Sequence, residues 1–299
     1  MAFQESILEQ YQAYLTRIGK SSHTVKAYTH DVDSFAKWWA QTTGEVVSPR
    51  LVDPREIGDY RSFMLQRRLK PATINRRLKA MTHFFRWAKR MELTTENPFD
   101  VLENVSIKKQ QDTAPRWLDY KEQLALLRAV RKAESQRDLA VVQTLLGTGL
   151  RISELAALNV SDVELSERKG MLYVRVGKGM KARQIPLDRR TRQVLSDYLE
   201  VRPEMDGLSE EERERLFFGQ RGPLTEREID YLVTKYAYQA QLENCTAHTL
   251  RHSFGKNLID SGTPADQVAT LMGHESLDTT KIYTRPSQRD LERAVRRAA

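Results

Sequence analysis

The sequence predicts a mainly α protein with two domains: an all-helical N-terminal domain, then an α+β domain of helices with a small antiparallel sheet or β-hairpin. Three observations support this fold class. Apolar residues recur at helical spacing along most of the chain. Two short β-favourable runs flank the Gly-Lys-Gly segment at 177–179, which is typical of a β-hairpin. The length of 299 residues suits about two domains with respectable cores.

Four helices are expected in the first domain, which we place at residues 1–105. They cover 3–19, a segment from Ser22 through Trp38, 54–69 and 72–90. Pro71 suits the first turn of the last helix, because a proline at that position loses no helical hydrogen bond. One narrow stripe of this helix is apolar and predicts its buried face: Ile74, Leu78, Met81, Phe85 and Ala88.

A polar segment at 106–115 lacks helical periodicity and ends in a proline, which predicts an interdomain linker. The second domain is then expected at 116–284. Helices are predicted at 119–133, at 136–146 and from Ile152. Strands are predicted at 171–176 and 182–187, with a third strand at 216–219. Helices follow after Thr225, with breaks at 262–264 and 273. Residues 285–299 are amphipathic, with Leu291 and Val295, and predict a C-terminal tail helix.

The charge of the chain favours a polyanionic partner. There are 48 Lys and Arg residues against 40 Asp and Glu residues, a formal net charge of +8. Residues 61–90 contain ten Lys or Arg and no acidic residue. Four cations of the predicted helix 72–90 lie opposite its apolar stripe: Arg76, Lys79, Arg86 and Arg90. An ordinary solvated face would interleave acids with these cations, so we favour contact with the DNA backbone.

Membrane and secreted classes do not fit the sequence. No apolar run approaches the roughly 18 residues that cross a bilayer, and residues 1–10 hold no basic region followed by an apolar stretch. The single cysteine, Cys245, cannot form an internal disulfide, and clustered Cys/His zinc sites are excluded too. We therefore expect a cytoplasmic protein with no membrane partner.

Two segments pair a cation with groups suited to phosphate chemistry. Arg151 follows a glycine break and precedes a predicted helix, so its guanidinium and the free N–H groups of the helix N-terminus form an anion site. A surface arginine that caps nothing is the alternative. His248 and Arg251 are three residues apart on one helix face, which places a proton-transfer group beside a second phosphate clamp. A half-exposed structural histidine is the alternative there.

Zinc is a weaker interpretation of the second segment. His248 and His252 have the i,i+4 spacing of a zinc-binding helix. However, Thr249 stands where a metalloprotease has its glutamate, and the neighbouring Arg251 would repel a divalent ion. We expect no metal site.

Residues 263–283 also fit a helix-turn-helix that reads DNA bases, because two short predicted helices flank the turn at Gly273. That interpretation would make the protein a non-enzymatic regulator. It does not explain why two phosphate clamps, a hairpin lysine and Tyr283 occur in one domain.

Taken together, these motifs resemble the tyrosine site-specific recombinases, the integrases of the phage lambda type, and most closely their compact Xer-like members. Five segments carry the resemblance, in this order: Thr-Gly-Leu-Arg-Ile-Ser-Glu-Leu at 148–155, Gly-Lys-Gly at 177–179, His-Thr-Leu-Arg-His-Ser-Phe at 248–254, Leu-Met-Gly-His at 271–274 and Thr-Thr-Lys-Ile-Tyr-Thr at 279–284. The resemblance covers nearly the whole chain, including the helical N-terminal domain.

The resemblance implies a DNA strand transferase, with type IB topoisomerase-like chemistry through a 3′-phosphotyrosyl intermediate. The residues that match the family's catalytic set are Arg151, Lys178, His248, Arg251 and His274, with Tyr283 as the nucleophile. The arginines and His274 would hold the non-bridging oxygens, and His248 would accept the tyrosine proton. Lys178 would protonate the leaving 5′-hydroxyl, or equally contact a phosphate. Because a phosphotyrosine ester stores the bond energy, no metal or nucleotide cofactor is expected.

An assembly on DNA is implied as well. The first domain would be a core-binding (SAM-like) DNA-binding domain and the second the catalytic domain, together clamping a double-stranded recombination site. The family acts as a tetramer, so we expect a homotetramer or a heterotetramer with a related recombinase. The tail at 285–299 resembles a helix that docks onto a neighbouring subunit; otherwise it folds back on its own domain. The expected role is chromosome dimer resolution, with a mobile-element recombinase, a regulator and a type IB topoisomerase as alternatives.

Overall fold

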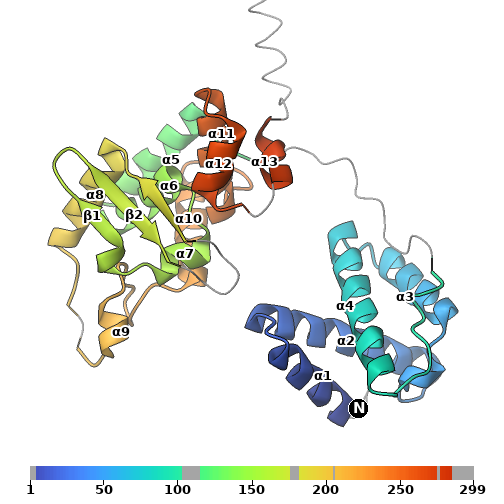
Figure 1. Cartoon of the computed structure of the whole chain (residues 1–299). Helices are drawn as coiled ribbons and strands as arrows, with labels where there is room; N and C mark the ends of the chain where they lie inside the picture. The colour runs from blue at the N-terminus through green and yellow to red at the C-terminus, as the bar shows by residue number, and fades with distance from the viewer. Residues whose placement is uncertain (1–4, 103–114, 176–181, 205, 275–276, 285–299) are drawn as a thin grey trace, which may run out of the picture. The chain divides into compact units, whose positions relative to one another are not determined.

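The computed structural model describes residues 5–102, 115–175, 182–204, 206–274 and 277–284. The chain divides into two compact units, residues 1–113 (unit 1) and 114–299 (unit 2), which follow each other along the colour bar of Figure 1. Lys178, the tail at 285–299 and nearly all of the predicted linker at 106–115 lie outside the described residues.

Unit 1 is helical throughout its described part. Its elements are α1 (Glu5–Arg17), α2 (Ser22–Thr43), the short 3-10 helix η1 (Pro49–Leu51), α3 (Pro54–Gln66) and α4 (Pro71–Arg90), which confirms the four predicted helices. The Ser21 hydroxyl caps α2 by accepting a hydrogen bond from the Thr24 N–H. Asp53 and Glu56 form a reciprocal capping box at the start of α3. Pro71 occupies the first turn of α4, as predicted.

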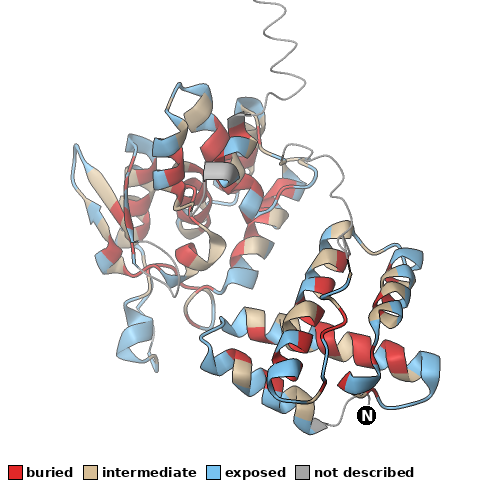
Figure 2. Cartoon of the chain, turned by 45° about the vertical axis from the view of Figure 1, so that its right-hand side comes forward, coloured by how far each residue is buried: buried red, intermediate tan, exposed pale blue. Residues whose placement is uncertain are grey.

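Aromatic rings dominate the core of unit 1. The Tyr11 ring meets Phe84 edge-on at 5.2 Å, and Phe35 meets Tyr60 edge-on at 5.1 Å, a geometry that adds to the gain from burying the rings. All five positions of the predicted α4 stripe are buried, and so are Ala80, Phe84 and Trp87. The buried face of α4 is therefore broader than the stripe. Figure 2 shows the buried residues of the helices as red bands.

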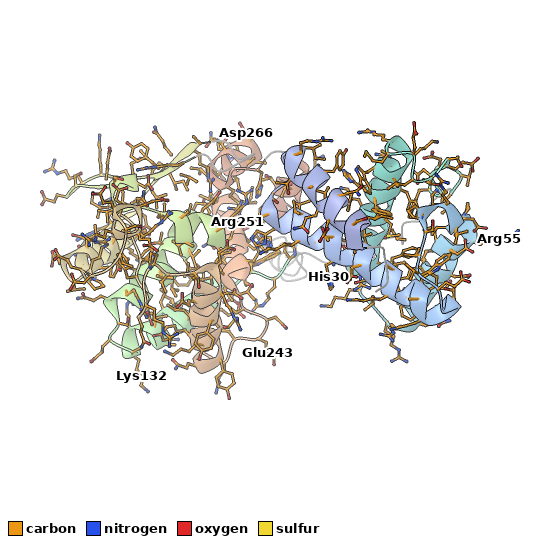
Figure 3. All side chains as sticks on the ribbon, turned by 90° about the horizontal axis from the view of Figure 1, so that it is seen from below. His30, Arg55, Lys132, Glu243, Arg251 and Asp266 are labelled. Atoms are coloured by element: carbon orange, nitrogen blue, oxygen red, sulfur yellow. The ribbon has the colours of Figure 1, made fainter. Side chains whose placement is uncertain are left out.

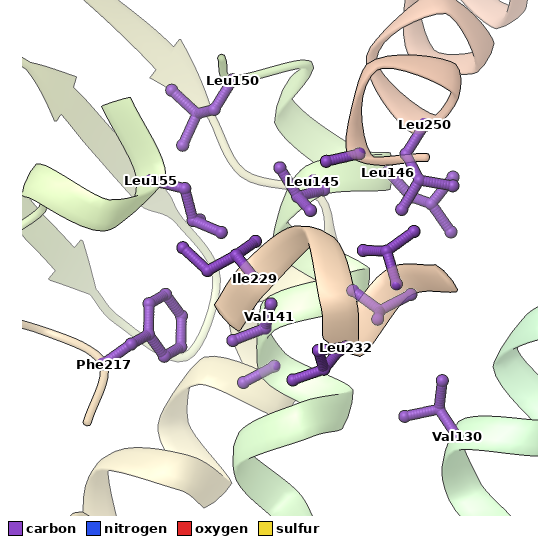
Figure 4. Packing of buried hydrophobic residues seen from close by; sticks show 14 of the residues in the cluster. Val130, Val141, Leu145, Leu146, Leu150, Leu155, Phe217, Ile229, Leu232 and Leu250 are labelled. Atoms are coloured by element: carbon purple, nitrogen blue, oxygen red, sulfur yellow. The ribbon is translucent and has the colours of Figure 1, made fainter. Parts of the chain in front are cut away.

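Unit 2 combines helices with one small sheet. The helices are α5 (Tyr120–Lys132), α6 (Gln136–Thr148), α7 (Ile152–Ala157), the 3-10 helix η2 (Val160–Asp162), α8 (Arg189–Glu200), α9 (Glu210–Arg213), α10 (Glu226–Gln239), α11 (Ala247–Asp260), α12 (Ala265–Met272) and α13 (Leu277–Thr284). Helix α6 is buried on most of its surface and packs against α5, α8 and α11. Its Val141, Leu145 and Leu146 lie at the centre of the core in Figure 4, with Leu155 and Leu250 close by.

The sheet has three antiparallel strands in the order β1-β2-β3. These are β1 (Val163–Leu165), β2 (Gly170–Val174) and β3 (Arg183–Pro186). Pairing of Met171 with Pro186 and of Val174 with Arg183 confirms the predicted hairpin. The predicted third strand at 216–219 is wrong, because this segment makes a single isolated bridge, between Phe218 and Pro223, and its apolar side chains are buried in the core of unit 2. A short apolar run predicts burial, but its periodicity does not tell a strand from another buried segment.

Two predicted glycine breaks are helix ends. Gly149 ends α6 with φ +62°, and Gly273 ends α12 with φ +63°; this left-handed conformation favours glycine. Gly149 lies two residues before the predicted site residue Arg151, and Gly273 lies directly before His274. Among the helices described, none is long and apolar enough to cross a membrane.

Candidate active site

A pocket of about 610 Å³ in unit 2 brings three predicted site residues together. Arg151 precedes α7, His248 and Arg251 lie on α11, and all three line this pocket with Arg227 of α10. Arg151 and Arg251 are 100 positions apart in the sequence, and packing of α11 against α6 and α10, and of α7 against α10, places them in one cavity. Two guanidiniums beside an imidazole suit a phosphate group.

The Arg251 guanidinium is fixed by backbone carbonyl groups. Its Nη1 donates to the Gly149 oxygen at 2.5 Å and its Nη2 to the Met272 oxygen at 2.6 Å. The residue is 3% exposed, and Figure 3 labels it on α11. Burial, with the charge of Arg151, lowers the pKa of Arg251 to about 10, so the guanidinium stays charged at neutral pH.

Arg151 is held by the first turn of its own helix and by the end of α12. Its Nη1 donates to Glu154 Oε1 at 3.0 Å, and its Nη2 donates to the Gly273 oxygen at 2.8 Å. The Arg151 backbone N–H also donates to Glu154 Oε2 at 2.8 Å. About a third of the Arg151 side chain is exposed, so it remains accessible from the pocket.

Sequence reasoning missed two members of this cluster, Glu154 and Arg183. Glu154 is buried beneath the arginines, and Arg183 of β3 donates to both of its carboxylate oxygens, at 2.8 and 2.7 Å. Burial alone would raise the pKa of Glu154, but hydrogen bonds from Arg183 and the Arg151 backbone lower it. The spacing of Arg151 and Glu154 within one helical turn could have indicated the carboxylate. Nothing local to β3 indicates Arg183.

His274 follows the α12 cap and lies beside the predicted nucleophile. Its Nδ1 is 2.8 Å from the Thr280 hydroxyl, and its ring is nearly parallel to the Tyr283 ring with centroids 6.1 Å apart. Burial, together with the charges of Arg251 and Arg151, lowers the pKa of His274 to about 4. The imidazole is therefore neutral at pH 7 and has one N–H to donate.

Tyr283 is buried in this structure and does not line the pocket. Its ring packs with Phe254, Val268 and Met272, close to the backbone of α11 at Gly255. A Cβ at position 255 would come within 2.9 Å of the ring, so glycine is required there. Burial raises the pKa of the phenol to about 12, while the charges of Arg251 and Arg151 act to lower it.

His252 is a further residue whose place the sequence did not predict. Its Nδ1 is 2.8 Å from the Tyr283 hydroxyl, and its ring meets the His248 ring edge-on at 4.3 Å. Burial and the neighbouring His248 lower the pKa of His252 to about 4. Both partners of this hydrogen bond are therefore neutral at pH 7. His252 attracts notice in the sequence only through its zinc-like spacing from His248.

The cationic face of α4 is less uniform than the sequence suggests. Arg76, Lys79, Arg86 and Arg90 are all exposed. Arg76 Nη1 nevertheless lies 2.5 Å from Asp31, a buried carboxylate of α2, and Arg90 donates to the Tyr14 hydroxyl at 3.3 Å. No acid lies within residues 61–90 themselves, but Asp31 of the neighbouring helix α2 pairs with Arg76. Lys79 and Arg86 pair with no acid among the described residues.

The chain matches family models over both units. Residues 116–289 match the phage integrase family, and residues 8–92 match the phage integrase N-terminal SAM-like domain. Tyrosine recombinase XerC of Pediococcus pentosaceus is 32% identical over 298 residues, with 97% of each chain covered. Tyrosine recombinase XerA of Thermococcus kodakarensis is 30% identical over 299 residues, with 100% of this chain and 97% of the relative covered.

Solved structures agree with these matches. A crystal structure of XerA recombinase has a TM-score of 0.55 at 26% identity and covers 98% of both chains. XerH site-specific recombinase, bound to a palindromic difH substrate in a post-cleavage complex, has a TM-score of 0.73 at 23% identity. That comparison covers 91% of this chain and 78% of the XerH chain, and it shows a likeness of fold.

Proposed function

Because the chain belongs to the phage integrase family and is a Xer-like tyrosine recombinase, we propose that it cuts and rejoins DNA at a specific site with Tyr283 as its nucleophile. The observation that supports this assignment most directly is the pocket lined by Arg151, His248 and Arg251. The rings of His274 and Tyr283 lie beside one another in the C-terminal part of unit 2. All the described members of the predicted catalytic set therefore belong to one region of unit 2.

The two arginines suit the charge that develops during cleavage. Attack on a phosphodiester produces a pentacoordinate phosphorane with more negative charge on its non-bridging oxygens than the substrate has. Arg151 and Arg251 stabilise this charge, and the neutral His274 adds a hydrogen bond. Because backbone carbonyls already orient both guanidiniums, little reorganisation is needed when the phosphate binds.

Proton transfer is the second requirement. The phenol must lose its proton during attack, and burial holds its pKa at about 12. Tyr283 therefore leaves the hydrogen bond to His252 and moves to the phosphate, where His248 accepts the proton. Lys178 gives a proton to the leaving 5′-oxygen, which departs as a hydroxyl. The same groups act in reverse when a 5′-hydroxyl of the partner strand attacks the phosphotyrosine, so the bond energy is conserved without a nucleotide.

The relatives support a proposal for the biological role. We propose that the protein acts in the cytoplasm as a tetramer on two recombination sites, alone or with a related recombinase, and resolves chromosome dimers. Matches to proteins named XerC and XerA over nearly their whole length support this role. Sequencing the genomic DNA that the protein captures gives a test. One site per chromosome supports dimer resolution, whereas sites at the ends of a mobile element indicate the alternative.

A suicide substrate tests the chemistry. On a recovered site with a nick beside the scissile phosphate, wild-type protein should accumulate a covalent adduct that survives a denaturing gel. Tyr283→Phe should form none, because no other group carries the phosphotyrosyl bond. Tyr238→Phe is the matched control, since Tyr238 is 86% exposed on α10 and should leave the yield unchanged. An adduct formed by Tyr283→Phe, or none by the wild type, contradicts the proposal.

A further inference from the structure

Three successive carbonyl groups at the end of α12 each accept a hydrogen bond from a different arginine. Arg183 Nε donates to the Leu271 oxygen at 2.8 Å, Arg251 Nη2 to the Met272 oxygen at 2.6 Å, and Arg151 Nη2 to the Gly273 oxygen at 2.8 Å. The last carbonyls of a helix have no partner within the helix, and cations are favourable there. The helix end therefore aligns three guanidiniums side by side.

One carboxylate, that of Glu154, lies among these three guanidiniums. Arg183 binds it through both oxygens, at 2.8 and 2.7 Å, while Arg151 binds one oxygen at 3.0 Å and Arg251 is 3.9 Å away. The Glu154 side chain is 2% exposed and that of Arg183 is 5% exposed. A bidentate pair of this kind is the stronger geometry for an arginine and a carboxylate. Arg183 therefore carries most of the interaction with Glu154.

Counting charges shows what Arg183 adds. Without it, Arg151, Arg251 and Glu154 would present a net charge of +1, and the buried carboxylate would compete with the phosphate for both arginines. With it, the net charge is +2, which matches a phosphorane whose charge grows beyond that of the diester. Buried charges interact strongly because water does not screen them.

We propose that Arg183 is a positioning residue: it neutralises Glu154 and thereby leaves the positive charge of Arg151 and Arg251 available to the phosphate. This inference rests on the proposed function. Arg183 does not line the pocket, so it acts through Glu154 and not by touching the substrate. Its Nε, Nη1 and Nη2 are all engaged, with Leu271 and with Glu154.

The fold makes room for this arginine at Gly273. A Cβ at position 273 would lie 2.7 Å from Arg183 Nη1, and the positive φ of +63° also favours glycine. Arg183 lies on β3, where its partner in the sheet is Val174, and its side chain points inward while Gln184 is exposed. The strand alternation thus directs Arg183 beneath the end of α12.

The test compares Arg183→Met with Arg183→Met/Glu154→Gln. The single variant leaves the Glu154 charge on the two clamp arginines, and we expect adduct formation on the suicide substrate to slow by about 100-fold, as for one oxyanion donor removed. The double variant removes that charge and should recover at least about tenfold of the loss. A purely structural role predicts the opposite order, because the double variant lacks more native hydrogen bonds.

A second readout does not depend on recombination. Inorganic phosphate is titrated into the DNA-free protein and followed by the imidazole resonances of His248, a residue that lines the pocket. Phosphate affinity should fall in Arg183→Met and recover in the double variant. If phosphate affinity falls and recovers in this way while the wild type forms no adduct with DNA, the proposed function fails, but the role of Arg183 in neutralising Glu154 holds. The inference is overturned if the double variant neither forms adduct faster nor binds phosphate more tightly than Arg183→Met.

Folding is controlled separately. Thermal unfolding identifies any variant that has lost its native structure, and Arg183→Lys is the reserve variant because it keeps the charge but not the two-pronged geometry. It should lie between the wild type and the double variant in phosphate affinity if charge dominates. Arg183→Lys that folds normally yet binds phosphate no better than Arg183→Met contradicts the proposal.

Discussion

The three histidines of the candidate site differ from exposed histidines in one property that can be measured. Burial lowers the pKa of His248, and it lowers the pKa values of His252 and His274 to about 4, with the charge of Arg251 adding to the effect in each. Between about pH 4 and 6.5 the unfolded chain therefore binds more protons than the folded chain. We expect the free energy of unfolding of unit 2 to fall as the pH decreases from 6.5 towards 4.

Urea unfolding at pH 7, 6 and 5 measures this slope. His252→Gln keeps a polar partner for the Tyr283 hydroxyl but cannot titrate. The free energy of unfolding of this variant should therefore fall less steeply with decreasing pH, by a slope equivalent to the uptake of up to one proton. His23→Gln is the matched control, because His23 is exposed on α2 and should leave the slope unchanged. Equal slopes for His252→Gln and the wild type would mean that His252 is not held neutral by the fold.

At the scale of elements, the helix ends decide where the site residues go. Gly149 ends α6 with φ +62°, and a Cβ there would come within 2.3 Å of the Phe254 ring. We expect Gly149→Ala to cost about 3 kcal/mol of unfolding free energy, from a left-handed alanine and an overpacked ring. It should also lower adduct formation, because the Gly149 carbonyl holds Arg251.

Gly262→Ala is the control for this helix end. Gly262 also has a positive φ, +86°, but nothing lies within 4 Å of a Cβ at that position. Its substitution should cost only the backbone strain, about 1 kcal/mol, and leave adduct formation unchanged. Chemical denaturation of the two variants gives the difference, and equal costs would mean that contact with Phe254 does not matter.

Local signals predicted most of the helices, but α8 and α9 were not predicted. Contacts between segments that are far apart in the sequence could not be predicted either. Pro71 and the apolar stripe of α4 are visible in the sequence, and the helix runs from Pro71 to Arg90. The three-residue strand Val163–Leu165 is too short to show a period, and it was missed. Arg183 reaches Glu154 only because β3 passes beneath α12, which no local pattern encodes. Likewise, Asp31 meets Arg76 only once α2 packs on α4.

For the molecule as a whole, charge should govern how tightly DNA is bound. The net charge is +8, and the ten cations of residues 61–90 fall in unit 1. Removing one cation that neutralises a DNA phosphate reduces the dependence of log affinity on log salt by about 0.9. Lys79 and Arg86 are exposed on α4 and pair with no acid in the described part of the chain. Arg76 already has part of its charge neutralised by Asp31.

Lys79→Ala/Arg86→Ala should therefore reduce the slope by about 1.8, whereas Arg76→Ala should reduce it by less than about 0.9. Arg131→Ala/Lys132→Ala removes the same charge from the last turn of α5, where Lys132 lies well away from Arg251 in Figure 3. That control should change the slope little. Fluorescence anisotropy of a labelled duplex at several salt concentrations measures all of them. If the two double variants reduce the slope equally, net charge and not the α4 face determines binding, and the cations of α4 are an ordinary solvated surface.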